Sequence, residues 1–281
     1  MLRSMFSAVS GLRSHQTMMD VTGNNIANVN TTGYKGSRTT FQETLTQLQR
    51  GGAAAIEDGE VGGPAGGRNP MQLGLGSQVA ATDMVFTQGA SQATGRETDL
   101  AIQGDGFFMV ETGDGRGFMR SGAFTFDNEG HLVGPGGELV LGANDDTLGG
   151  DTLEDMDPIQ VDLEEYTDVT IGGDGMIVGR DGDGEAQELA RIGMARFANT
   201  EGLERVGNGM FQASGASGEP IIDTPGEDGL GTLQAGTLEM SNVDLAQEFT
   251  NLILSQRGFQ ANSRTITTSD ELLQELVNMK R

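Results

Sequence analysis

Heptad rows at both ends of the chain limit most strongly what this sequence can fold into. The C-terminal segment has an apolar residue every seven positions, and Phe249 follows the first of them by four: Leu245, Leu252, Phe259, Ile266 and Leu273. The N-terminal segment has the same seven-residue row, formed by Met5, Leu12, Met19 and Ile26. Two more apolar residues, Leu2 and Val9, lie three positions before Met5 and Leu12. Such rows keep one face of a helix against another helix. They predict two terminal helices that pair within one chain or between chains.

The limits of these helices follow from local signals. We expect the first over residues 2–28, weakened by Gly11 and Gly23 and ended by the Asn-rich run 24–30. Ser241, with Asp244 three residues later, resembles a capping box and predicts the start of the second. Gly258 is a weak point in it because glycine disfavours a helix interior.

The charge is distributed unevenly along the chain. The net charge is +3 over residues 1–50, −25 over 51–235 and −2 over 236–281. The near-neutral ends are therefore expected to pack, and the acidic middle to stay solvated. A surface this acidic argues against nucleic acid as a partner, because binding phosphates requires cations.

The middle of the chain reads as short strands separated by glycine turns. Alternating apolar residues and turn sequences between about 75 and 235 predict an antiparallel β-domain. Its expected hairpins pair 169–171 with 176–178, and 192–197 with 210–211. A second short amphipathic segment is expected over 41–48, and the composition of 51–70 predicts a flexible linker.

Composition and motifs give little support for an enzyme. The chain has no Cys, no Trp, two Tyr and two His, so thiolate sites and disulfides are excluded and a histidine-rich metal site is not expected. Asp181, Asp183 and Glu185 resemble a calcium loop, but Ala186 replaces its glycine and Ile192 its final glutamate. We expect a solvated hairpin turn there, and no catalytic, cofactor or metal site elsewhere.

Three blocks of sequence resemble the flagellar rod–hook axial protein family. They are NNIANVNTTGYK (residues 24–35), GRETDLAIQGDGFFMV (95–110) and the tail from 240 to 281. The positions that carry these motifs are Asn24, Asn25, Asn28, Gly33, Lys35, Gly104, Gly106 and Phe107. With GSRTTF (36–41) and NPMQLGLGSQV (69–79), the resemblance covers nearly the whole chain.

The resemblance implies an α+β fold with a discontinuous organisation. Residues 1–35 with 240–281 would form an inner, coiled-coil-like helical domain, 36–75 with 232–239 a linker region, and 76–231 a mainly antiparallel outer β-domain. The apolar rows would form subunit interfaces. Phe41 and Leu45 match an export-gate pattern, although helix packing explains these two residues equally well.

Within the family, the chain is most similar to short hook subunits of the Gram-positive type. The implied function is a non-enzymatic subunit that assembles with itself into the curved hook, next to the distal rod, hook cap and hook–filament junction proteins. The alternative is the straight distal rod, although the GSRTTF block and the VNMKR ending favour the hook. A glycan-binding or glycan-cleaving β-protein is a third, weaker hypothesis.

The resemblance also implies where the protein acts. The first twenty residues lack a secretory apolar region, and no stretch is long and apolar enough for membrane insertion. We therefore expect export through the flagellar type III apparatus without a cleaved signal peptide, to the extracellular hook or basal body.

Overall fold

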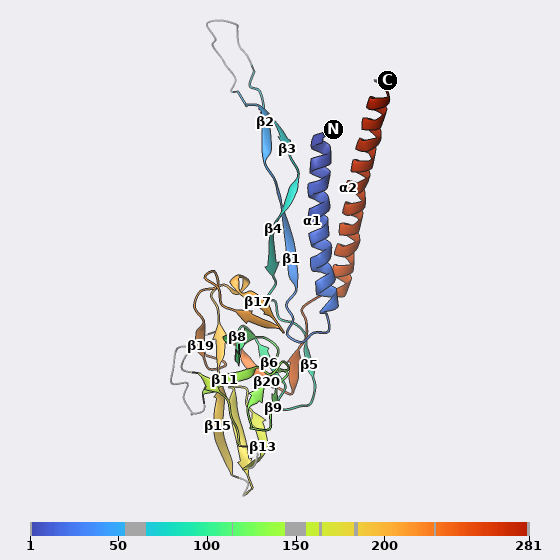
Figure 1. Ribbon diagram of the computed structural model, residues 1–281. Helices are drawn as coiled ribbons and strands as arrows, with labels where there is room; N and C mark the ends of the chain where they lie inside the picture. The colour runs from blue at the N-terminus through green and yellow to red at the C-terminus, as the bar shows by residue number, and fades with distance from the viewer. Residues whose placement is uncertain are drawn as a thin grey trace. The chain divides into compact units, whose positions relative to one another are not determined.

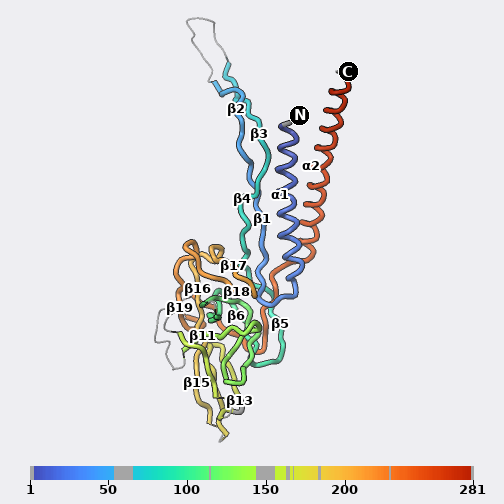
Figure 2. Tube along the Cα trace, viewed as in Figure 1, coloured from blue at the N-terminus to red at the C-terminus, as the bar shows by residue number. Residues whose placement is uncertain are grey.

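The structure is a computed structural model (Figures 1 and 2) that confirms the α+β fold. It describes the following residues: 2–53, 66–113, 115–143, 156–162, 165–182, 185–227 and 229–279. The chain divides into two compact units. The first unit comprises Met1–Ile26, Ser37–Asp83 and Leu245–Arg281, and the second comprises Ala27–Gly36 and Met84–Asp244.

Two helices, α1 (Leu2–Ala27) and α2 (Leu245–Met279), lie side by side in the first unit (Figure 1). Gly11 of α1 faces Asn262 of α2, and His15 faces Gly258. The pairing advances in α1 as it retreats in α2, so the two helices are antiparallel. The terminal helices predicted from the heptad rows are confirmed. The second one begins at Leu245 rather than Ser241, whose hydroxyl instead accepts a hydrogen bond from the N–H of Val243 at 3.3 Å.

A long β-ribbon completes the first unit. It pairs β1 (Ser37–Glu43) with β4 (Ser77–Met84), and β2 (Thr46–Arg50) with β3 (Met71–Gly74). The expected amphipathic segment 41–48 is therefore two strands, because pairing with residues 71–84 overrides a helix-like apolar spacing. Of the expected linker 51–70, residues 54–65 lie outside the described chain, and an antiparallel bridge joins Ala53 to Arg68.

The second unit is built from short antiparallel strands. Its main sheet runs in the order β13-β14-β15-β11-β7-β8-β18-β17, with other strands attached at its sides. The strands are β5 (Ser91–Ala93), β6 (Leu100–Gln103), β7 (Phe107–Thr112), β8 (Gly115–Met119), β9 (Thr125–Phe126), β10 (Leu132–Val133), β11 (Leu139–Ala143), β12 (Asp157–Pro158), β13 (Tyr166–Ile171), β14 (Met176–Asp181), β15 (Ala186–Ile192), β16 (Met194–Arg196), β17 (Glu204–Gly207), β18 (Met210–Gln212), β19 (Ile221–Asp223), β20 (Thr232–Ala235) and β21 (Thr237–Glu239).

The strand pairings test the expected hairpins. The hairpin of β13 with β14 is confirmed, since Thr170 lies opposite Val178 and Ile171 opposite Ile177. The expected pairing of 192–197 with 210–211 is wrong. β16 instead pairs with β7 and β19, and β18 pairs with β8 and β17. Sequence shows that these segments are strands, but partners far apart in the chain are not encoded in local alternation.

Neighbouring residues of β7 point to opposite faces of the sheet and divide the core in two. Phe108 belongs to the larger cluster, with Leu100, Leu132 and Ile177. Phe107 belongs to an aromatic cluster, and its ring lies 5.7 Å from that of Phe86, 5.9 Å from Phe197 and 5.8 Å from Phe211. Phe107 directly follows the Gly-Asp-Gly turn at 104–106. The alternation along the strand directs its side chain into the aromatic cluster. Within the described chain, no helix has the length and apolarity needed to cross a membrane.

Candidate functional site

A buried ion cluster of Lys35, Arg120 and Glu239 lies in the second unit, and we refer to it as the ion cluster. The ammonium of Lys35 donates to Glu239 Oε1 at 2.8 Å, and Arg120 Nε donates to Glu239 Oε2 at 2.5 Å. The N–H of Gly89 also donates to Glu239 Oε1, at 2.8 Å. All three charged side chains are buried. One carboxylate thus joins three segments that are far apart in sequence.

The guanidinium of Arg120 also holds the loop between β6 and β7. Its two terminal nitrogens donate to the backbone carbonyls of Ile102, Gly104 and Gly106. Gly104 and Gly106 have φ of 114° and 140°, which side chains rarely adopt. A Cβ on Gly104 would also approach Gly231, and one on Gly106 would overlap Met194. The backbone conformation of this loop and its close neighbours therefore require glycine at both motif positions.

The other motif residues of the second unit organise its entry segment, 27–36. The hydroxyl of Thr31 donates to Asn28 Oδ1 at 3.1 Å. Gly33, with φ of 67°, donates its N–H to the Glu239 carbonyl at 2.8 Å. The N–H of Gly36 donates to Asn242 Oδ1 at 2.8 Å. These contacts tie the segment after α1 to the segment before α2.

The surroundings of the ion cluster shift the pKa values of Glu239 and Lys35. Burial would raise the pKa of Glu239, but Arg120, Lys35 and the Gly89 N–H together hold that pKa below its ordinary value. Burial lowers the pKa of Lys35 despite its bond to Glu239. Both pKa values are lowered, which favours the charged form of Glu239 but disfavours that of Lys35. The reason is that Glu239 is held by two cations and an amide, whereas Lys35 is buried and shares its carboxylate with Arg120. The carboxylate is therefore the member on which the ion cluster depends.

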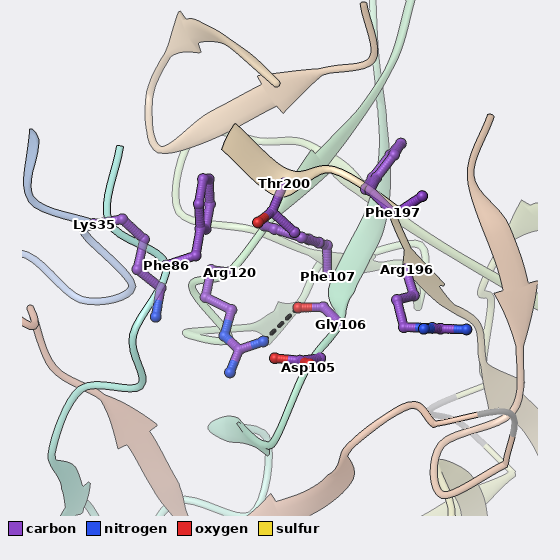
Figure 3. Close-up of a pocket in the computed structure, with 10 residues that line it drawn as sticks. Lys35, Phe86, Asp105, Gly106, Phe107, Arg120, Arg196, Phe197 and Thr200 are labelled. Atoms are coloured by element: carbon purple, nitrogen blue, oxygen red, sulfur yellow. Dashed lines mark hydrogen bonds between the residues drawn. The ribbon is translucent and has the colours of Figure 1, made fainter. Parts of the chain in front are cut away.

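A pocket of about 290 Å³ adjoins the ion cluster (Figure 3). Its lining residues are Lys35, Phe86, Asp105, Gly106, Phe107, Arg120, Arg196, Phe197, Ala198 and Thr200. Arg196 ends β16, and its Nε is buried without a hydrogen-bond partner. The pocket thus combines cationic groups with three phenylalanine side chains.

In the first unit, the helices meet through small and polar residues. A Cβ on Gly11 would lie 2.7 Å from the amide nitrogen of Asn262, and one on Gly258 would overlap the His15 ring. Ser255 is fully buried on α2. The glycines that weaken each helix on its own thus allow close approach of the pair.

The predicted interface residues fall into two groups. Half-buried in the unit are Met5, Leu12, Met19, Ile26, Leu252, Ile266 and Leu273, whereas Val9, Leu245, Phe249 and Phe259 are exposed. The side chain of Leu2 lies outside the described residues. Other large apolar side chains outside the heptad rows are also exposed on the helices, among them Phe6, Ile253, Leu254, Leu272, Leu276 and Val277. The interface assignment stays a prediction.

The remaining predicted residues lie in the first unit, on α1 and along the ribbon. Asn24 lies on the exposed side of α1. Asn25 is buried and pairs with the backbone of Ser37, donating to its carbonyl at 2.7 Å and accepting from its N–H at 3.0 Å. Phe41 lies on β1 with its ring 6.2 Å from that of His15, and Leu45 is 81% exposed between β1 and β2. Their role in export stays a prediction.

Sequence reasoning missed Arg120, Glu239 and Asn242. Glu239 directly precedes the C-terminal block and Asn242 lies within it, and their proximity to Lys35 and Gly36 follows only from the fold. Arg120 had no local signal, because a single arginine after a strand is usually a solvated surface residue.

Comparisons with known proteins match three parts of the chain. Three family descriptions match: "Flagella basal body rod protein" over residues 5–35, "Flagellar hook protein FlgE/F/G D1 domain" over 101–179, and "Flagellar basal body rod FlgEFG protein C-terminal" over 234–279. These ranges contain the N-terminal helix and Lys35, the loop held by Arg120, and Glu239 with the C-terminal helix.

Full-length relatives match as well. The flagellar basal-body rod protein FlgG of Bacillus subtilis is 46% identical over 282 residues, and that of Borreliella burgdorferi 37% over 286, each covering all of both chains. The flagellar hook protein FlgE of Borreliella burgdorferi is 29% identical over 447 residues, again covering all of both. The chain belongs to the flagellar rod and hook protein family, whose members are components of the basal body and hook.

Proposed function

We propose that this chain is the structural, non-catalytic subunit of the distal rod of the flagellum, which assembles with further copies of itself. The observation that carries the proposal is the full-length match to rod proteins. The two rod relatives align over 282 and 286 residues, almost the 281 residues of this chain. The hook relative needs an alignment of 447 residues, so it carries long insertions that this chain lacks.

This proposal replaces our first hypothesis of a hook with the alternative that we considered beside it. The GSRTTF and VNMKR blocks that favoured the hook are short, whereas the rod relatives match along the whole chain. The supporting physical feature is the exposed apolar surface of α1 and α2, which a polymer would bury. Burying a large apolar side chain fully contributes about 1.5–3 kcal/mol, and large contiguous exposed apolar patches mark interaction surfaces.

In this proposal, the partners are further copies of the chain, the neighbouring axial proteins and the flagellar type III export apparatus. Neither membrane insertion nor nucleic acid has a part in it. The glycan hypothesis has no supporting observation.

Electron cryotomography of cells that lack this gene tests the proposal. We expect basal bodies with a shortened rod and no hook, and recovery of both when the gene is restored. Basal bodies with a complete rod but no hook would instead establish the hook. Intact rods and hooks would exclude both axial roles.

A further inference from the structure

Basic side chains are scarce in the second unit, and three of them line one pocket. Residues 27–36 and 84–244 contain 8 Lys and Arg but 31 Asp and Glu. Lys35, Arg120 and Arg196 all line the pocket next to the ion cluster. A local group of cations within an acidic surface focuses the electrostatic field on an incoming anion.

Arg196 is the cation that is available to such an anion. Lys35 and Arg120 are bound to Glu239, but the buried Nε of Arg196 has no hydrogen-bond partner. An unsatisfied buried N–H is unfavourable, and a carboxylate would satisfy it with a charge-assisted bond. Asp105, the acidic residue of the lining, is exposed.

The walls of the pocket favour an ion pair. In Figure 3, Lys35 and Arg196 lie on opposite sides, with Arg120, Asp105 and Phe107 drawn between them. Phe86 and Phe197 add further aromatic surface. Charges attract more strongly beside such low-dielectric walls than in water. A volume of about 290 Å³ accommodates a carboxylate side chain with room for the backbone that carries it.

The same unit presents a matching acidic group, which we call the acidic tip: Asp181 and Glu185, where β14 leads into β15. The N–H of Asp181 donates to the carbonyl of Glu185 at 3.1 Å, and both residues are exposed. In Figure 1 the end of the unit with β13 and β15 points away from β17, which follows the pocket residue Thr200 in the chain.

We propose that the acidic tip of one copy docks into the pocket of another copy and pairs with Arg196. The contact is heterologous, since it joins two different surfaces, and such contacts build rings or open helical filaments rather than two-fold dimers. The inference rests on the proposed function as a self-assembling subunit. It adds a charge-specific contact to the apolar contacts of the helices.

Charge reversal in the full-length protein tests this contact. We would measure, by sedimentation, the concentration at which polymers form for Arg196→Glu, for Asp181→Arg with Glu185→Arg, and for the combination. Each charge reversal alone should raise this concentration about tenfold or more, because like charges then face each other. The combination should restore assembly, because the pair is recreated with opposite polarity, and Arg196→Lys should assemble nearly normally.

Matched controls carry the same charge changes elsewhere in the unit. Arg96→Glu, and Glu97→Arg with Glu219→Arg, alter exposed residues outside the pocket and tip. We expect these variants to assemble like the wild type, and circular dichroism should show every variant folded.

A titration that does not require polymers provides a second measurement. A peptide with the sequence of residues 179–187, added below the polymerisation concentration, should shift the NMR signals of Arg196 and Thr200 saturably in the wild type. The Thr200 signal should not shift in Arg196→Glu. Normal assembly of Arg196→Glu, or a combined variant as defective as its parents with no peptide binding, would overturn the inference and leave the rod proposal intact. A wild-type chain that remains monomeric at all concentrations would instead count against the rod proposal, and the titration would still report on the pocket.

Discussion

At the scale of single residues, the ion cluster shows how a carboxylate and its cations differ in importance. Glu239→Gln leaves Lys35 and Arg120 buried without an anion, and breaking a buried ion pair in this way costs about 3–5 kcal/mol. Lys35→Met leaves Glu239 bound to Arg120 and Gly89, so its cost should be clearly smaller. Urea denaturation, followed by far-UV circular dichroism, measures the free energy of unfolding of both variants. Equal losses for the two variants would contradict the central role of Glu239.

The lowered pKa of Glu239 makes a prediction for the pH dependence of stability. A carboxyl whose pKa is lowered by folding contributes stability that is complete above its unfolded value, 4.5, and is lost as the pH falls towards the folded value. The free energy of unfolding should therefore decrease more steeply below this pH in the wild type than in Glu239→Gln. Denaturation curves at several acidic pH values compare the two. Parallel pH profiles would show that other carboxyls account for the acid sensitivity.

At the scale of elements, the same substitution should have opposite effects at two helix glycines. Gly23→Ala adds a methyl group where nothing lies within 4 Å, so it should stabilise α1 by about 0.5–1 kcal/mol. Gly258→Ala places the methyl group against the ring of His15 and should instead cost about 1–3 kcal/mol by overpacking. Thermal unfolding followed by helical circular dichroism measures both changes. Stabilisation by both variants would mean that the helices do not approach closely in solution.

The outer face of α2 gives a second prediction at this scale. Phe249 is 52% exposed within the chain, so a polymer contact that covers it would gain roughly 1 kcal/mol or more. Phe249→Asp should raise the polymerisation concentration by about tenfold while α2 stays folded. Gln256→Asp is the control, since it introduces the same charge at the same heptad position, seven residues later, without removing apolar area. Comparable polymerisation of the two variants would exclude Phe249 from the interface.

Local sequence predicted the elements better than their partners. The heptad rows located both helices, because a seven-residue repeat is a property of one segment. They did not distinguish Leu252, half-buried within the chain, from Phe259, which is exposed, because both belong to the same seven-residue row. The segment 41–48 was misread because its strand conformation depends on residues 71–84, which are distant in sequence.

At the scale of the whole molecule, the ion cluster consists of residues that are far apart in the chain, so the sequence alone predicted only one of them. Lys35 was selected through the family motif, but no repeat or spacing connects it with Arg120 and Glu239, which lie 85 and 204 positions further along the chain. Their meeting depends on the return of the chain from the β-strands to α2. The unit is therefore complete only when both of its connecting segments, before β1 and after β21, are present.

This dependence predicts different behaviour for two fragments that both lack the helices. A fragment of residues 27–244 keeps Lys35, Arg120 and Glu239, and it should be folded and monomeric at high concentration, because it lacks the apolar faces of α1 and α2. A fragment of residues 36–235 loses Lys35 and Glu239 and leaves Arg120 buried without its carboxylate, so it should unfold at a lower urea concentration. Sedimentation and urea denaturation of the two fragments measure assembly and stability separately. Long polymers of the 27–244 fragment would show that the helices are dispensable for assembly, and equal stability of the fragments would show that the ion cluster does not hold the unit together.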